Sequence, residues 1–220
     1  MTRKLLIVGC LSAFLFVAIS GCESMCQKPS ADKSSCKETT AAPPPAKPTP
    51  LAPPTSPKKA QKYVLRVNCG ATENYTDKVG NLWVADQETS EGKPWGADDG
   101  LTTDRGDVPI SGTDAPRVYQ SERYSMAAYE FNVPNGKYTV RLHFAETYEG
   151  ITEAGQRVFS VSINDKVALV DFDVYKVAGG PQKPVVQVFK GVEVKNGRIL
   201  IGFSTSVENP EINGIEILSE

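Results

Sequence analysis

Residues 63–220 consist largely of short stretches in which apolar and polar residues alternate. From Tyr138 to Phe144, every second residue is large and apolar. This period of two residues is typical of a β-strand with one buried face. Similar stretches, rich in β-branched and aromatic residues, cover residues 63–70, 127–134, 136–146, 157–165, 185–194 and 197–205. No stretch longer than a turn or two has the 3.6-residue period of an amphipathic helix, so an all-β fold is expected.

Turn residues separate these stretches. Asn135-Gly136 and Asn196-Gly197 each stand between two of them, and Asn164-Asp165 closes another. Such pairs favour two-residue turns, so we expect three β-hairpins. Many short antiparallel strands in a domain of this length predict a jelly-roll-like antiparallel β-sandwich. The segment from Asn74 to Tyr119 is less regular and contains both tryptophans, which makes it a candidate for binding loops.

The N-terminal residues have the composition of an export signal. Arg3 and Lys4 precede an apolar run, Leu5–Ile19, which is too short for a confident membrane span and typical of a signal peptide. An uncleaved anchor helix is the alternative. The run ends in "AISGC", which resembles the lipobox of bacterial lipoproteins. This resemblance implies cleavage after residue 21, lipid attachment to Cys22, and a place in the cell envelope, at the outer membrane.

Residues 22–62 are predicted to be a disordered tether. Half of the chain's 16 prolines lie between Pro43 and Pro57, in a stretch that favours extended polyproline II. The tether carries seven lysines against three acidic residues, a net charge of +4. Since Arg3 and Lys4 add +2 and the whole chain has −2, residues 63–220 carry −8. A domain this acidic is not expected to bind nucleic acid through its phosphates.

The three cysteines outside the signal peptide and lipobox are predicted to have different roles. Cys26 and Cys36 lie in the tether and could pair in an oxidising compartment. Cys69 lies within a strand-like run, so we expect a small buried apolar residue rather than a reactive thiol.

The sequence offers little catalytic machinery. His143 is its one histidine and lies inside an alternating strand, where a structural or surface role is expected, and no GxSxG, HExxH or P-loop motif is present. Five carboxylates lie near loop edges and could in principle flank a glycosidic bond, although solvated side chains are expected: Glu122, Glu146, Glu149, Glu153 and Glu208. We therefore expect no enzyme and no cofactor.

The acidic run "GADDGLTTDRGD", residues 96–107, suggests two further sites. Its four aspartates could hold calcium, but their spacing departs from the EF-hand loop. Its last three residues resemble an adhesion tripeptide. A solvated loop is the expectation for both, and no metal site is predicted.

A carbohydrate-binding site needs fewer specialised residues than a catalytic or metal site. Sugars present apolar C–H faces and hydroxyl edges, so a site combines aromatic rings with carboxylates or amides. The predicted strand ends offer Trp95, Tyr124, Tyr148, and Glu208 beside Asn209. Tyr148 follows the point where alternation stops, among polar neighbours, so its ring is not predicted to be core.

Several motifs together resemble the malectin domain family, in the family's order and over nearly all of residues 63–220. They are "VLRVNCG", "WVADQ", "VYQSERY", "HFAETYEG", "GQRVFSVSIND", "DFDVY" and "ENPEINGIEI". The resemblance implies a jelly-roll-like sandwich that binds glucose-containing oligosaccharides. It implies sugar contacts by Tyr124, by Tyr148 with Glu149, and by Glu208, and it aligns an upstream tyrosine near Trp95.

Two positions depart from the family pattern. Glu149 stands where a second aromatic is usual, which removes a stacking surface, and Glu208 is one methylene longer than the usual aspartate. Both bear on which glycan is bound. The predicted partner is a glycan, with membrane attachment through Cys22. A protein-interaction or envelope-scaffold module is the alternative, and a glycoside hydrolase is a more remote one.

Overall fold

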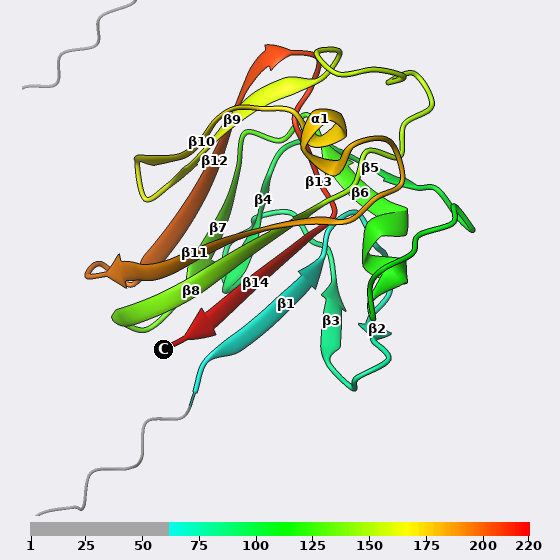
Figure 1. Ribbon diagram of the computed structural model, residues 1–220. Coiled ribbons are helices and arrows are strands. Elements are labelled where there is room, and N and C mark those ends of the chain that lie inside the picture. The colour runs from blue at the N-terminus through cyan, green and yellow to red at the C-terminus, as the bar shows by residue number, and fades with distance from the viewer. Residues whose placement is uncertain (1–61) are drawn as a thin grey trace, which may run out of the picture. The chain divides into compact units, whose positions relative to one another are not determined.

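A computed structural model describes residues 62–220 of the protein (Figure 1). The predicted signal peptide, the lipid site at Cys22, the tether and the Cys26–Cys36 pair lie outside the described residues and stay predictions. Within residues 62–220, no helix has the length and apolar character needed to cross a membrane.

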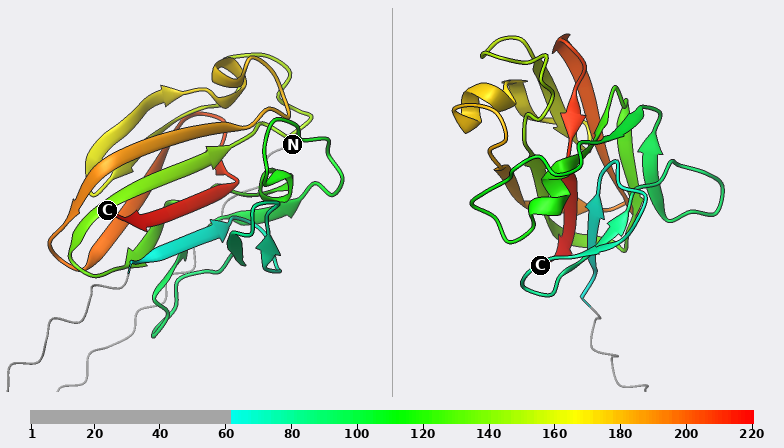
Figure 2. Two further views of the ribbon diagram at one scale, coloured as in Figure 1. Left: turned by 60° about the horizontal axis from the view of Figure 1, so that its bottom comes forward. Right: turned by 90° about the vertical axis from the view of Figure 1, so that its right-hand side faces the viewer.

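Two larger sheets pack face to face, and a small third sheet lies at one end (Figure 2). The first has six strands in the order β11 (Val185–Val194), β8 (Gly136–Phe144), β14 (Gly214–Ser219), β1 (Val64–Asn68), β3 (Leu82–Ala85) and β2 (Tyr75–Thr76). The second has five: β10 (Lys166–Phe172), β9 (Val158–Ile163), β12 (Arg198–Val207), β7 (Ala128–Asn132) and β4 (Trp95–Asp98). The third is β13 (Glu211–Ile212), β6 (Ser121–Tyr124) and β5 (Leu101–Asp104).

The pairing confirms the predicted all-β sandwich. Strands pair antiparallel throughout the described residues except β1 and β3, which are parallel. Helical structure there is limited to a five-residue 3-10 helix, η1 (Pro116–Gln120), and a five-residue α-helix, α1 (Val174–Ala178). Asp173 caps α1 by accepting a hydrogen bond from the Lys176 N–H, and Gly179 ends it in the left-handed conformation.

The core lies between the two larger sheets and follows the alternation. In β8, Tyr138, Val140, Leu142 and Phe144 are all at most 2% exposed and face β7 and β12 across the sandwich. Cys69 is fully buried within the same core, as expected, and burial raises the pKa of its thiol. Burial of apolar side chains in this layer stabilises the fold by about 25 cal/mol per Å² of apolar surface removed from water, which is the main stabilising term.

Near His143, the opposite face of β8 is covered by a smaller apolar cluster that includes Trp83 and Tyr119. His143 is buried beneath it: Nδ1 lies 2.7 Å from the Tyr119 hydroxyl and Nε2 lies 3.1 Å from the Glu216 carboxylate. The ring edge-packs on Trp83 with centroids 5.1 Å apart. His143 thus has a structural place in the core.

Two of the three predicted hairpins are wrong. Asn164-Asp165 does form one, between β9 and β10, with both residues at positive φ. Asn135-Gly136 instead connects β7 to β8, and Asn196-Gly197 connects β11 to β12, in each case passing from one sheet to the other. A tight turn reverses the chain, but which sheet the next strand joins depends on where its apolar face is buried.

Candidate binding site

The floor of the site is one face of the small third sheet. The register places Thr103 of β5 opposite Glu122 of β6, and Glu211 of β13 opposite Tyr124 of β6. Because residues two apart in a strand share a face, Glu122 and Tyr124 lie side by side, and their partners Thr103 and Glu211 flank them. Arg123, between them in sequence, points to the reverse side.

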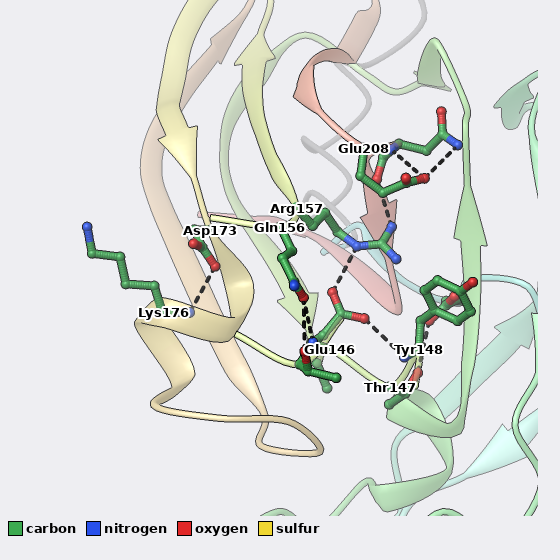
Figure 3. A network of polar contacts seen from close by, with 12 residues as sticks. Glu146, Thr147, Tyr148, Gln156, Arg157, Asp173, Lys176 and Glu208 are labelled. Carbon is green, nitrogen blue, oxygen red and sulfur yellow. Dashed lines mark hydrogen bonds and ion pairs between the residues drawn. The ribbon is translucent and has the colours of Figure 1, made fainter. Parts of the chain in front are cut away.

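The loop after β8 forms a wall of the site. Two carboxylates beneath this loop, those of Glu146 and Glu122, hold it in place, and Figure 3 shows the first of them. Glu146 accepts hydrogen bonds from the Tyr148 N–H at 3.0 Å and from Arg157 Nε at 2.8 Å. Thr147 donates its hydroxyl to Glu122 at 2.9 Å. The backbone of Tyr148 is therefore held by groups buried below it, while its side chain is 45% exposed.

A pocket of about 240 Å³ opens between this loop and the small sheet. Thr103, Arg105, Glu122 and Tyr124 line it from the sheet side, and Tyr148, Arg157, Glu208 and Asn209 line it from the loops. Sites for drug-sized ligands span roughly 300–1,000 Å³, so this pocket suits about one sugar-sized ring with its neighbours left outside. It combines two phenol rings with acidic, amide and guanidinium groups.

The structure brings together four of the six predicted contact residues: Tyr124, Tyr148, Glu208 and Asn209. Glu208 has a left-handed backbone at φ 53°, and its carboxylate accepts hydrogen bonds from the backbone and side-chain amides of Asn209, both at 3.1 Å. Glu149 is exposed and does not line the pocket.

Trp95 lies elsewhere. It is in β4, at the edge of the five-stranded sheet, with its ring stacked beside Phe131 at a centroid distance of 6.1 Å. A separate cavity of about 410 Å³ adjoins it, lined by Lys93, Glu130 and other polar residues. The structure therefore does not bring Trp95 to the pocket that holds Tyr124 and Tyr148.

The expectation of solvated loop carboxylates fails for two of the five. Glu122 is 1% exposed and Glu146 is fully buried, and each is paired with an arginine at 2.8 Å: Glu122 with Arg105 and Glu146 with Arg157. Protein donors rather than water satisfy both acids, because each is buried within hydrogen-bond distance of an arginine.

Glu211 is a third buried acid in this cluster. Neither of its oxygens has a hydrogen-bond partner within residues 62–220, and the residue is fully buried. Burial raises the pKa of Glu211 well above the usual carboxyl range, and the nearby charges of Glu122 and Glu146 raise it further. Burial also raises the pKa of Glu146, although Arg157 opposes this shift, whereas Glu211 has no paired arginine within hydrogen-bond distance in the described part of the chain.

Sequence reasoning missed both arginines. Arg105 belongs to the acidic run interpreted as a solvated loop, yet its Nη2 binds Glu122 and its guanidinium lies 5.3 Å from the centroid of the Tyr148 ring. Arg157 is the first residue of a predicted strand and lies just before the observed β9, and it donates to Glu146 and to the Asn209 carbonyl. The only sequence signal for these arginines was their position beside the first or last residue of a strand. This position is common, and it does not predict which acid an arginine will pair with.

The sandwich and its pocket define a β-sandwich binding module. The protein-family model for the malectin domain matches residues 63–215, which is most of the chain, so the chain belongs to the malectin domain family.

The chain is also similar to parts of two plant receptor-like proteins. A probable receptor-like protein kinase of Arabidopsis thaliana is 40% identical over 75 residues, covering 34% of this chain and 8% of that protein. A probable leucine-rich-repeat receptor-like kinase of the same plant is 31% identical over 157 residues, covering 59% and 15%. The chain thus spans only a small part of these relatives.

Two solved structures share the fold. A Bacteroides uniformis beta-glucuronidase has a TM-score of 0.65 at 23% identity, with 72% of this chain and 18% of that chain covered. A plant complex of the peptide RALF23 with FER and LLG2 has a TM-score of 0.58 at 23% identity, with coverage of 70% and 48%.

Proposed function

We propose that this protein is a non-enzymatic carbohydrate-binding module that holds a sugar ring in the pocket between Tyr124 and Tyr148. One observation carries the proposal: two tyrosine rings, from β6 and from the loop after β8, line one small pocket with acidic, amide and guanidinium groups. Rings supply stacking for the C–H face of a sugar, and the polar groups supply partners for its hydroxyl edge. Membership of the malectin family supports the same ligand class.

The rest of the chain would present this module at a membrane. A lipid on Cys22 and a Pro-rich tether would place the domain in the cell envelope, on the periplasmic or outer surface of the outer membrane. A pocket for about one ring binds weakly by itself, and several anchored copies facing a polymeric glycan would raise the effective concentration of sites.

A protein partner is the second candidate. A solved relative of the same fold is a complex with the peptide RALF23 and with LLG2. On this chain, the edge strands β10 and β11 carry exposed valines, among them Val170 at 72% and Val188 at 46%. Such residues on unpaired strand edges are the feature that favours a protein-binding role.

Hydrolysis has less support. A glycosidase needs one carboxylic acid and one carboxylate free to act on the glycosidic bond. In the pocket, Glu122 is bound by Arg105 and Thr147, and Glu146 below it is bound by Arg157. These acids fix arginines and a loop rather than face the ligand unpaired.

Replacing Tyr148 by alanine tests the proposal. We expect binding of the full chain to its best ligand on a glycan array to weaken about tenfold or more, because a stacking ring contributes ~0.5–1.5 kcal/mol beyond its burial. The melting temperature should change by less than about 2 °C, since the side chain is 45% exposed. Tyr175→Ala in α1, outside the pocket, is the control. Undiminished binding in Tyr148→Ala would contradict the assignment.

Gly150 gives a second test that leaves the ring chemistry intact. A Cβ at this position would lie 2.5 Å from Tyr148 Cε1 and 2.7 Å from its Cζ, so Gly150→Ala must displace the ring. Moving the end of an exposed side chain costs little stability, and we expect weakened binding of similar size with nearly unchanged melting. In the Tyr148→Ala background the alanine should have no further effect on affinity. Independent, additive losses would show that Gly150 acts through another group.

A further inference from the structure

Two arginines in the pocket have donors that the protein does not use. Arg157 gives Nε to Glu146 at 2.8 Å and Nη1 to the Asn209 carbonyl at 2.7 Å, and Arg105 gives Nη2 to Glu122 at 2.8 Å. Arg157 Nη2, Arg105 Nη1 and the buried Arg105 Nε have no hydrogen-bond partner among the described residues, and both side chains line the pocket. Arg157 as a whole is only 4% exposed, but its Nη2 is not buried, so a ligand atom in the pocket can replace water as the acceptor of this donor.

Both guanidinium groups are held in place before any ligand arrives. Glu146 is fully buried and Glu122 is 1% exposed, so each arginine is fixed by an acid that cannot turn to solvent. In Figure 3 the Arg157 guanidinium lies between Glu146 and Glu208, on the side of the network that carries Tyr148. Donors fixed in this way lose little entropy on binding an acceptor.

The local charges leave room for an anion. Glu122 and Glu146 are each compensated by one arginine, and burial raises the pKa of Glu211, which favours its neutral form. Glu208 is exposed at the rim, where water and salt screen its charge, and its carboxylate is already bound by Asn209. The floor of the pocket is therefore close to neutral, with its free donors belonging to the two cations.

We infer that the sugar bound between Tyr124 and Tyr148 is an acidic one, a hexuronic acid whose carboxylate accepts hydrogen bonds from Arg105 and Arg157. The carboxylate of such a sugar lies at the edge of its ring, so it can meet the guanidinium groups while the ring face meets a tyrosine. Hydrogen bonds between ionised groups are about twice as strong as neutral ones, and the planar guanidinium matches a carboxylate. This inference rests on the proposed function and names the ligand class of the same site.

The first test needs no variant. The full chain would be titrated with methyl glucuronide, its methyl ester and methyl glucoside, three ligands of one ring shape of which only the first is charged. We expect the acid to bind roughly 10- to 100-fold more tightly than either neutral sugar, from the usual strength of charged hydrogen bonds. This preference should shrink as salt is added.

A variant then assigns the preference to the pocket. Arg105→Gln should reduce the advantage of the acid over its ester, while Arg198→Gln, whose side chain is 43% exposed and pairs with Glu130 outside the pocket, should leave it unchanged. If Arg105→Gln does not fold, by thermal melting, the comparison of acid with ester on the unaltered chain decides alone.

Each other outcome is distinguishable. Equal affinity for the acid, the ester and the glucoside would overturn the acidic ligand and leave the carbohydrate module standing. Equal affinity for methyl glucuronide, glucose 6-phosphate and inorganic phosphate would replace the sugar carboxylate by a general anion site. No binding of any of these sugars or of a glycan array would remove the proposed function, and the inference with it.

Discussion

Asp86→Ala is expected to lower the free energy of unfolding by about 3–5 kcal/mol, a large share of the ~5–15 kcal/mol of a typical domain. Asp86 Oδ2 accepts hydrogen bonds from Arg123 Nε at 2.8 Å, from the Gly70 N–H at 2.7 Å and from the Tyr129 hydroxyl at 2.9 Å. The Arg123 and Asp86 side chains are only 4% and 3% exposed. Alanine would leave this buried guanidinium with only the exposed carboxylate of Glu88, 3.9 Å from Nη1, to compensate it.

Urea unfolding of the variant measures this loss. Glu130→Ala is the matched control, because Glu130 pairs with Arg198 at 3.4 Å on the surface, where such pairs contribute about 0–1 kcal/mol. A loss below about 1 kcal/mol in Asp86→Ala would mean that the pair is open to water in solution. Arg123 lies between Glu122 and Tyr124 in β6, so the same variant should also weaken ligand binding by loosening the pocket floor from behind.

Glu211→Gln is expected to make the protein more stable than the unaltered chain as the pH rises above about 5. The folded pKa of Glu211 is raised well above the value of 4.5 for an unperturbed glutamate. The folded state therefore keeps a proton that the unfolded state releases, and stability falls as pH rises between the two pKa values. The slope is about 1.4 kcal/mol per pH unit for one proton. Glutamine keeps the shape and carries no charge, so it removes this slope.

The free energy of unfolding would be measured at pH 5, 7 and 9 for both proteins. The difference between them should be small at pH 5 and grow with pH, whereas Glu193→Gln, a surface change at a residue paired with Lys195, should give a constant difference. A Glu211→Gln difference that does not change with pH would mean that Glu211 is ionised in the folded state.

The acid side of the profile should have the opposite sign. Burial alone would raise the pKa of Glu216, but His143, Arg141 and Arg66 together hold it below its usual value. The stability that this carboxylate contributes is present above the unfolded pKa and is lost as the pH falls through the folded one. The protein is therefore expected to be most stable in the pH range between the titration of Glu216 and the titration of Glu211.

Local pattern was sufficient for the strands and their buried faces. The alternation from Tyr138 to Phe144 predicts which side of β8 meets the core, because side chains in a strand point alternately to its two faces. The burial of Cys69 followed from the same reasoning. The motifs that carried the family resemblance also hold structural residues: Asp86 of "WVADQ" and Arg123 of "SERY" form the buried pair described above.

The pocket could be predicted only in part. Tyr124, Tyr148, Glu208 and Asn209 were predicted as contacts and line one pocket, whereas Trp95 lies beside another cavity. Trp95 was predicted as an aromatic residue near a strand end and by alignment with an upstream loop tyrosine of the family, and the position of a loop depends on which strand follows it. Here that strand is β4, which pairs with β7 at the edge of the second sheet.

Tertiary structure decided the connections between sheets and the ion pairs beneath the pocket. Asn135-Gly136 and Asn196-Gly197 mark turns, yet each passes between sheets because the next strand buries its apolar face against the opposite layer. Arg157 reaches Asn209 across 52 residues of chain, and Arg105 reaches Glu122 across 17. A residue's neighbours in sequence determine which face of a strand it occupies. Its partner across space is fixed only when the sheets pack and a buried charge must find its opposite.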